Sequence, residues 1–205
     1  MTMPLGEDEA DRTRRGSGIE HPEELPPAGG PIAVARTFAF IDLSGFTAYI
    51  EEHGVADAVE ILALFRLRAS EVAARRGVRV AKWLGDGAML VGVQSGPTVA
   101  AVAEMMARVN QLELRIRAGV AAGGVILFQG DDYIGRTVNI AARLCDVAEP
   151  GNMLATADVA DTAPPWVSRR PAPPVLLRGV GEVTGVCSLF VADDVTLPPV
   201  PLART

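Results

Sequence analysis

The sequence predicts an α+β fold with a ferredoxin-like βαββαβ core and extra strands towards the C-terminus. Short apolar runs that end at Asp, Gly or Pro alternate with longer stretches in which apolar residues recur at helical spacing. From residue 36 to residue 123 these segments follow the order strand, helix, strand, strand, helix, strand, which is the split βαβ arrangement. We therefore expect two helices on one face of a sheet and a second face that is free for a partner or a ligand.

Each element has its own local signal. The first strand, 36–42, is short and apolar and ends at Asp and Gly residues. The helix at 45–76 is stopped by Gly77, and its apolar stripe consists of Val55, Val59, Leu62, Phe65 and Ala69. The other expected elements are strands at 78–84 and 88–93, a helix at 97–111, strands at 114–123 and 124–129, a helix at 137–148, a strand at 152–156, a helical turn at 157–161, and closing strands at 175–179 and 185–192.

Two tails flank the predicted domain. Residues 1–30 are rich in Pro, Gly and charge and hold almost no large apolar residues, so we expect a disordered acidic tail. Residues 193–205 form a second, Pro-rich tail. The remaining segment, 31–192, suits a single domain, in which the Pro-rich stretch 163–174 loops over the surface before one last hairpin.

Charge and composition argue against several classes of protein. The net charge is −6, and residues 1–30 hold seven acidic residues against three arginines. The folded part is therefore nearly neutral, without a basic face for nucleic acid. No apolar run reaches the length of a membrane span, and the acidic N-terminus does not resemble a signal peptide. We expect a cytoplasmic protein whose two cysteines, Cys145 and Cys187, are reduced.

The first candidate site residue, Asp42, ends the first strand, and Gly45, Phe46 and Thr47 then open a helix. Free backbone N–H groups at a helix start favour phosphate. A carboxylate beside a phosphate is repelled unless a divalent cation lies between them. We interpret Asp42 as a Mg²⁺ ligand and the backbone from Gly45 to Thr47 as a phosphate contact. The alternative is an Asp near a helix N-cap, which needs no ligand.

The second cluster contains Lys82 and Asp86. Asp86 lies in a Gly-Asp-Gly turn, a hairpin signal. We expect strands 36–42 and 78–84 to be neighbours, so that Asp86 and Asp42 share cations, as two-metal phosphoryl chemistry requires. Lys82 interrupts an apolar strand that we expect in the interior of the sheet. The alternatives are ordinary turn chemistry for Asp86 and a solvated or edge position for Lys82.

The third cluster combines a loop with a helix. Asn139 and Arg143 are four residues apart and therefore share one helical face. Asp132 lies in the Gly-flanked loop that precedes this helix. An Asn and Arg pair suits contacts to a sugar oxygen and a phosphate, because the planar guanidinium binds phosphate in a fork. The alternative is a solvated polar stripe.

Together the clusters resemble the catalytic domain of the class III adenylate/guanylate cyclases, over residues 36 to about 192. FIDLSGFT resembles the family's first metal motif. KWLGDGAML resembles the motif that joins a purine-reading Lys to the second metal Asp. DDYIGRTVNIAARLCDVAEPGNML resembles the segment with the second purine-reading residue and the Asn/Arg pair. The three motifs occur in the family's order, so the predicted fold is class III nucleotide cyclase-like.

The resemblance implies an adenylate cyclase, which converts ATP to 3′,5′-cyclic AMP and pyrophosphate. It assigns two Mg²⁺ or Mn²⁺ ions per site to Asp42 and Asp86, and it assigns the adenine edge to Lys82 and Asp132. Guanylate-specific relatives typically carry Glu and a small residue in place of this Lys and Asp. The pair therefore indicates ATP as the substrate.

The resemblance also assigns the ribose to Asn139, the transition-state charge on the α-phosphate to Arg143, and a triphosphate contact to Arg178. It implies a homodimer through the cyclase domain, in which one chain supplies the metal residues and the other supplies the purine, ribose and transition-state residues. The main alternative is a catalytically weak or inactive cyclase-like module that binds nucleotide and regulates a partner. A cyclase that condenses two GTP molecules and an RNA-binding sheet are disfavoured, since the GG(D/E)EF turn, the basic patch and the aromatic RNP pattern are missing.

Overall fold

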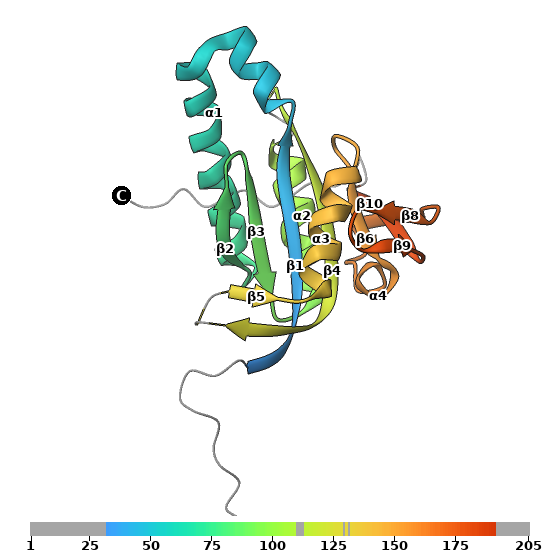
Figure 1. Cartoon of the computed structure of the whole chain (residues 1–205). Coiled ribbons are helices and arrows are strands. Elements are labelled where there is room, and N and C mark those ends of the chain that lie inside the picture. Colours follow the sequence, from blue (N-terminus) through green and yellow to red (C-terminus); the bar gives the residue numbers. More distant parts are fainter. Residues whose placement is uncertain (1–31, 110–112, 129, 131, 192–205) are drawn as a thin grey trace, which may run out of the picture.

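The computed structural model describes residues 32–109, 113–128, 130 and 132–191. The two predicted tails and Gln129, the last residue of one predicted strand, lie outside these described residues. Four helices occur in the described ranges (Figure 1). They are α1 (Phe46–Arg75), α2 (Ser95–Val109), α3 (Arg136–Val147) and α4 (Ala157–Ala160).

The central sheet has the strand order β2-β3-β1-β4-β6-β10-β7, and β5 pairs with β4 at one end. Its strands are β1 (Ile32–Ser44), β2 (Arg79–Leu84), β3 (Gly87–Gly92), β4 (Arg115–Phe128), β5 (Asp132–Ile134), β6 (Met153–Thr156), β7 (Val167–Pro171) and β10 (Val186–Val191). A separate two-stranded sheet contains β8 (Val175–Leu177) and β9 (Gly181–Val183). The first four strands of the order are those of a ferredoxin-like core, so the predicted fold class is confirmed.

The sheet is covered on both faces, because its side chains alternate between two apolar clusters. Ala39 and Leu90 pack with Phe65 of α1 and Val102 of α2 in the larger cluster. Their strand neighbours, such as Phe38, pack on the opposite face with residues of α3. The expectation of a free second face is therefore wrong where α3 packs on β1 and β4.

Three features of the strands differ from the sequence predictions. The strand beside β1 is β3, not β2, because the hairpin folds back so that its second strand lies inside. The predicted strands 114–123 and 124–129 form one strand, β4, which pairs with β1 without a break through Gly123 and Gly124. Finally, the Pro-rich stretch 163–174 contains β7, which pairs with β10, while β8 pairs with β9 and does not form a hairpin with β10.

Helix α1 is not one regular helix. Gly54 has φ 87° and ψ 169°, which are non-helical values that interrupt the helix. Residues before and after this point extend beyond the sheet at its upper end (Figure 1). As a result Val55 and Val59, predicted on the buried stripe, are 69% and 57% exposed, whereas Phe65 and Ala69 are fully buried.

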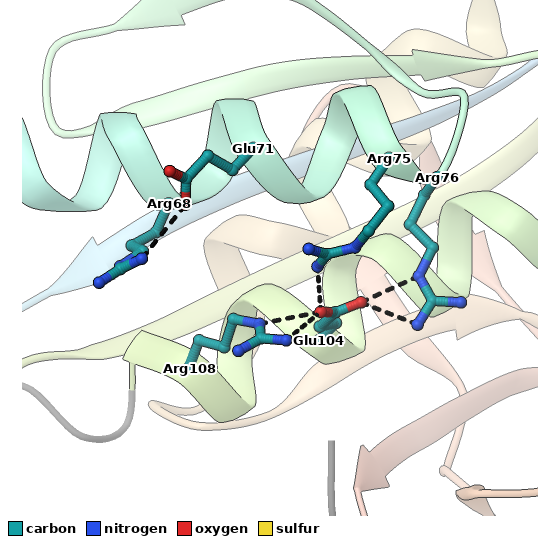
Figure 2. Close-up of polar contacts among 6 residues, drawn as sticks. All are labelled: Arg68, Glu71, Arg75, Arg76, Glu104 and Arg108. Atoms are coloured by element: carbon teal, nitrogen blue, oxygen red, sulfur yellow. Dashed lines mark hydrogen bonds and ion pairs between the residues drawn. The ribbon is translucent and has the colours of Figure 1, made fainter. Parts of the chain in front are cut away.

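A buried carboxylate joins α1 to α2. Glu104 of α2 has no exposed surface and accepts hydrogen bonds from three arginines, Arg75, Arg76 and Arg108 (Figure 2). Arg76 lies beyond the last residue of α1 and donates from Nε and Nη2 to Glu104 Oε2 at 2.9 and 2.8 Å. A charge this deep needs such partners, because burial without them is strongly unfavourable.

Candidate functional site

Asp42 is paired with a residue that the sequence did not single out. In β1 it lies in register with Arg117 of β4. The Nε and Nη2 atoms of Arg117 donate to Oδ2 of Asp42 at 2.8 and 2.7 Å. The hydrogen bonds to Asp42 raise the pKa of Arg117, although burial opposes the rise. The alternating pattern of residues 114–123 did not indicate this contact. Arg117 and Asp42 are 75 residues apart, and the register between their two strands is set by the tertiary fold.

The second predicted metal residue, Asp86, lies close to Asp42. Its carbonyl accepts a hydrogen bond from the backbone N–H of Leu43 at 3.3 Å. Burial raises the pKa of the Asp86 carboxyl, and the charge of Asp42 raises it further, while a backbone hydrogen bond and Arg117 oppose the rise. The structure thus brings the two carboxylates together, although β3 rather than β2 is the strand beside β1.

Gly87 makes room for the Asp42 carboxylate. It pairs with Asp42 across β1 and β3. A Cβ atom at this position would lie 2.6 Å from the carbonyl oxygen of Ile41 and 3.2 Å from Oδ1 of Asp42. The two oxygens of Asp42 therefore face different neighbours, since Oδ2 accepts from Arg117 and Oδ1 lies over the glycine.

The start of α1 is the helix start at which the sequence predicts a phosphate contact. Gly45 adopts a left-handed conformation with φ 82°, and Phe46 is the first residue of the helix. No side-chain hydrogen bond caps this helix start. The alternative role for Asp42, a capping carboxylate, is therefore not seen, because its Oδ2 atom accepts from Arg117 instead. The backbone N–H groups of a first turn have no partner within the helix.

Asp42 and Arg143, from different predicted half-sites, line one pocket of about 260 Å³ in a single chain. Arg143 donates from Nη1 to Oδ2 of Asp146 at 2.6 Å. The carbonyl of Asp146 accepts from Nη1 of Arg117 at 3.1 Å. The pocket is lined by Phe40, Ile41, Asp42, Leu84, Gly87, Arg117, Ala142, Arg143, Cys145 and Asp146. Its two arginines and two aspartates balance each other in charge.

Lys82 and Asp132 form an ion pair although 50 residues separate them. Lys82 lies on β2, which is an edge strand, so the predicted interior position is wrong. Asp132 begins the short strand β5, so the predicted loop is also wrong. The residues of the third sequence cluster therefore lie in different places. Asp132 contacts Lys82 of the second cluster, whereas Arg143 lines the pocket that contains Asp42.

Two further predicted residues do not reach the pocket. Asn139 is exposed on α3, one helical turn before Arg143. Arg178 is exposed in the turn between β8 and β9. The predicted roles of Asn139 and Arg178 stay predictions, since neither side chain lines the same pocket as Asp42.

The two carboxylates suit a hard divalent cation, because Mg²⁺ is held in proteins by one or two carboxylates together with substrate phosphates. No third His, Cys, Asp or Glu side chain completes a metal-holding group anywhere in the described part of the chain. Asp42 Oδ1 and the Asp86 carboxylate would hold such a cation. The remaining ligands would come from water and substrate.

Both cysteines are free thiols, as predicted. Cys145 of α3 lines the Asp42 pocket, and its Sγ donates to the carbonyl of Arg117 at 3.6 Å. Burial raises the pKa of the Cys145 thiol to about 12, and the Asp42 charge adds to this effect. Cys145 is therefore a protonated, poorly nucleophilic group at neutral pH.

Comparisons with known proteins agree with this geometry, although no family model matches the sequence. An uncharacterized protein of Mycobacterium tuberculosis strain H37Rv is 35% identical over 136 residues, which make up 65% of this chain and 36% of the relative. An adenylate cyclase of Glutamicibacter nicotianae is 31% identical over 136 residues, covering 65% of this chain and 34% of that protein. The crystal structure of the adenylyl cyclase CyaB from P. aeruginosa is similar with a TM-score of 0.68 and 25% identity, covering 80% of this chain and 97% of that chain.

The fold is that of the class III adenylyl/guanylyl cyclase catalytic domains, and the resemblance drawn from the three motifs is confirmed. The chain spans about a third of the length of the curated relatives it matches. Within the described ranges, no helix is long and apolar enough to cross a membrane.

Proposed function

We propose that the chain is an adenylate cyclase, which converts ATP to 3′,5′-cyclic AMP and pyrophosphate. The observation that carries this proposal is the convergence of the sequence motifs. Asp42 lies beside Asp86, and Lys82 forms an ion pair with Asp132 although 50 residues separate the two.

Specificity for adenine would come from Lys82 and Asp132. The Lys ammonium can donate to N1 of adenine, and the Asp carboxylate can accept from the 6-amino group. Guanine presents the opposite pattern, with an N–H at position 1 and a carbonyl at C6. The ion pair between the two side chains supports the idea that they act as one unit.

In the proposed reaction the ribose 3′-oxygen attacks the α-phosphorus and forms a new P–O bond. The bond from the α-phosphorus to the oxygen that bridges to the β-phosphate breaks, pyrophosphate leaves, and the 3′-hydroxyl proton goes to solvent. Arg143 would donate to the α-phosphate oxygens as negative charge develops there. Asn139 would orient the ribose, and the backbone from Gly45 to Thr47 would bind phosphate oxygens. Mg²⁺ or Mn²⁺, when bound, supplies charge neutralisation and a lower pKa for the hydroxyl.

The enzyme test is turnover of ATP and of GTP with Mg²⁺ and with Mn²⁺, with Asp42→Ala as the blank. We expect cyclic AMP from the wild-type chain, little cyclic GMP, and no product from the blank. Binding of ATP without any product would support the alternative, an inactive regulatory module. A preference for GTP would contradict the role given to Lys82 and Asp132.

We also infer a homodimer with sites shared between chains. Apolar side chains at the far end of the sheet support this, since Ile126 and Ile134 face each other across β4 and β5 and remain 44% and 56% exposed. A mixture of Asp42→Ala and Arg143→Ala chains tests the sharing. If sites are shared, one site of the mixed dimer holds both intact residues, so activity returns on mixing. If both residues act within one chain, every site carries a defect and no activity returns.

A further inference from the structure

We propose that Arg117 is a built-in counter-ion that competes with the divalent cation for Asp42, and so sets the cation concentration at which the site fills. The inference rests on the proposed function, because it takes Asp42 as a metal ligand. It goes further by giving the site a residue that opposes metal binding.

The first argument is the geometry of the carboxylate. Oδ2 of Asp42 accepts two hydrogen bonds from Arg117, at 2.8 and 2.7 Å. Such a charge-assisted contact to one oxygen occupies the lone pairs that a cation would use. Both residues lie on central, paired strands, β1 and β4, so the backbone holds the contact in place. Only the second oxygen, Oδ1 over Gly87, remains turned towards the hairpin that carries Asp86.

The second argument is electrostatic. Arg117 already neutralises one of the two carboxylates, because its guanidinium forms an ion pair with Asp42 at 2.7 Å. A divalent cation that approaches Asp42 meets the guanidinium charge at short range, where like charges repel strongly in a partly buried site. Arg117 also donates to the Asp146 carbonyl, so an alternative anchor for its side chain is already in place when it leaves Asp42.

The competing explanation is a purely structural ion pair, whose loss would weaken folding without strengthening metal binding. Two variants separate these possibilities. Arg117→Gln removes the charge beside Asp42. Arg115→Gln removes the same charge from an exposed side chain two residues away on the same strand, and so controls for net charge and for changes to β4.

The experiment measures Mn²⁺ binding to the full 205-residue chain without nucleotide, from the decrease of the free Mn²⁺ signal in electron paramagnetic resonance. We expect Arg117→Gln to lower the dissociation constant about tenfold or more relative to wild type, and Arg115→Gln to leave it unchanged. Arg117→Lys, which retains a charge but loses the forked contact, should fall between them. Circular dichroism confirms that each variant is folded.

The outcomes distinguish this inference from the proposed function. Equal or weaker Mn²⁺ binding by both Arg117 variants, with binding abolished by Asp42→Ala, overturns the counter-ion role and leaves the metal site standing. Mn²⁺ binding that is unaffected by Asp42→Ala overturns the metal site itself, and the counter-ion role with it.

Discussion

At the scale of single residues, Gly87 shows how an absent side chain shapes the candidate site. We expect Gly87→Ala to lower the free energy of unfolding by about 1–3 kcal/mol, because the new Cβ would lie 2.6 Å from a backbone oxygen that cannot move away. Asp42 would also shift, so the proposed cyclase activity should fall. Urea denaturation measures the first effect.

A matched control exists on β4, which lies on the other side of β1 from Gly87. A Cβ atom at Gly124 of β4 meets no other atom within 4 Å, so Gly124→Ala should change the free energy of unfolding by less than about 0.5 kcal/mol. Equal destabilisation by the two substitutions would show that the lack of space for a Cβ atom at Gly87 does not cause the loss of stability.

The two thiols should differ in reactivity. Because burial raises the pKa of Cys145 to about 12, its thiolate is scarce at pH 8, and we expect alkylation of the folded chain to modify the partly exposed Cys187 first. Peptide mass mapping after a short treatment with iodoacetamide identifies the modified residue. Preferential modification of Cys145 would mean that the Asp42 pocket opens readily to solvent.

At the scale of elements, Glu104 is the residue that fixes α1 against α2 (Figure 2). Removing one partner of a buried ion pair leaves the other charges without compensation, so Glu104→Gln should cost about 3–5 kcal/mol at neutral pH. The control is Glu71→Gln, since Glu71 pairs with Arg68 on the surface of α1 alone. That substitution should cost less than about 1 kcal/mol.

The difference in stability between wild type and Glu104→Gln should depend on pH, because it depends on the pKa of Glu104. Burial alone would raise that pKa, but hydrogen bonds from Arg108 and Arg76 and the charge of Arg75 outweigh burial and lower it below its ordinary 4.5. A lowered pKa means that the carboxylate stabilises the fold above pH 4.5 and loses this contribution as the pH falls through the folded value. The gap between wild type and Glu104→Gln in urea denaturation should therefore narrow below pH 4.5. A difference in stability that widened below pH 4.5 would contradict a lowered pKa for Glu104.

The elements also show which predictions a sequence supports. The helix predicted at 97–111 corresponds to α2, because Val99, Val102 and Val109 recur at helical spacing and are all buried. The stripe of α1 was wrong at Val55 and Val59, because hydrophobic periodicity does not reveal that the sheet ends before the helix does. The position of Lys82 was wrong for a similar reason: strand order decides which strand lies at the edge, and the two strands of a hairpin look alike in sequence.

At the scale of the whole molecule, the proposed dimer predicts a sensitive surface. Ile134→Glu places a charge among the exposed apolar residues at the end of β4 and β5, so we expect a lower weight-average mass in sedimentation equilibrium at micromolar concentration. Leu176→Glu is the control, because Leu176 is 78% exposed on β8, away from this surface. Equal masses for both variants and the wild type would place the dimer contact elsewhere.

The candidate site itself was predictable in its composition and less so in its arrangement. The residue types and motif order were enough to nominate Asp42, Asp86, Lys82 and Asp132, and the structure brings each pair together. Arg117 could not be nominated, because an arginine in an alternating strand is ordinary until the opposite residue is known. The register between β1 and β4 places Arg117 opposite Asp42.

The unbroken length of β4 has a consequence for how this chain tolerates insertions and deletions. One strand carries Arg117 beside Asp42 and, nine residues further on, the exposed Ile126. Successive side chains of a strand point to opposite faces. Loss or gain of a single residue between these two positions would turn Ile126 and Phe128 to the other face while Arg117 stayed in place. Changes of length within this strand should therefore be accepted only in steps of two residues. The pocket and the far end of the sheet are linked by whether the number of residues between Arg117 and Ile126 is odd or even, more than by which residues these are.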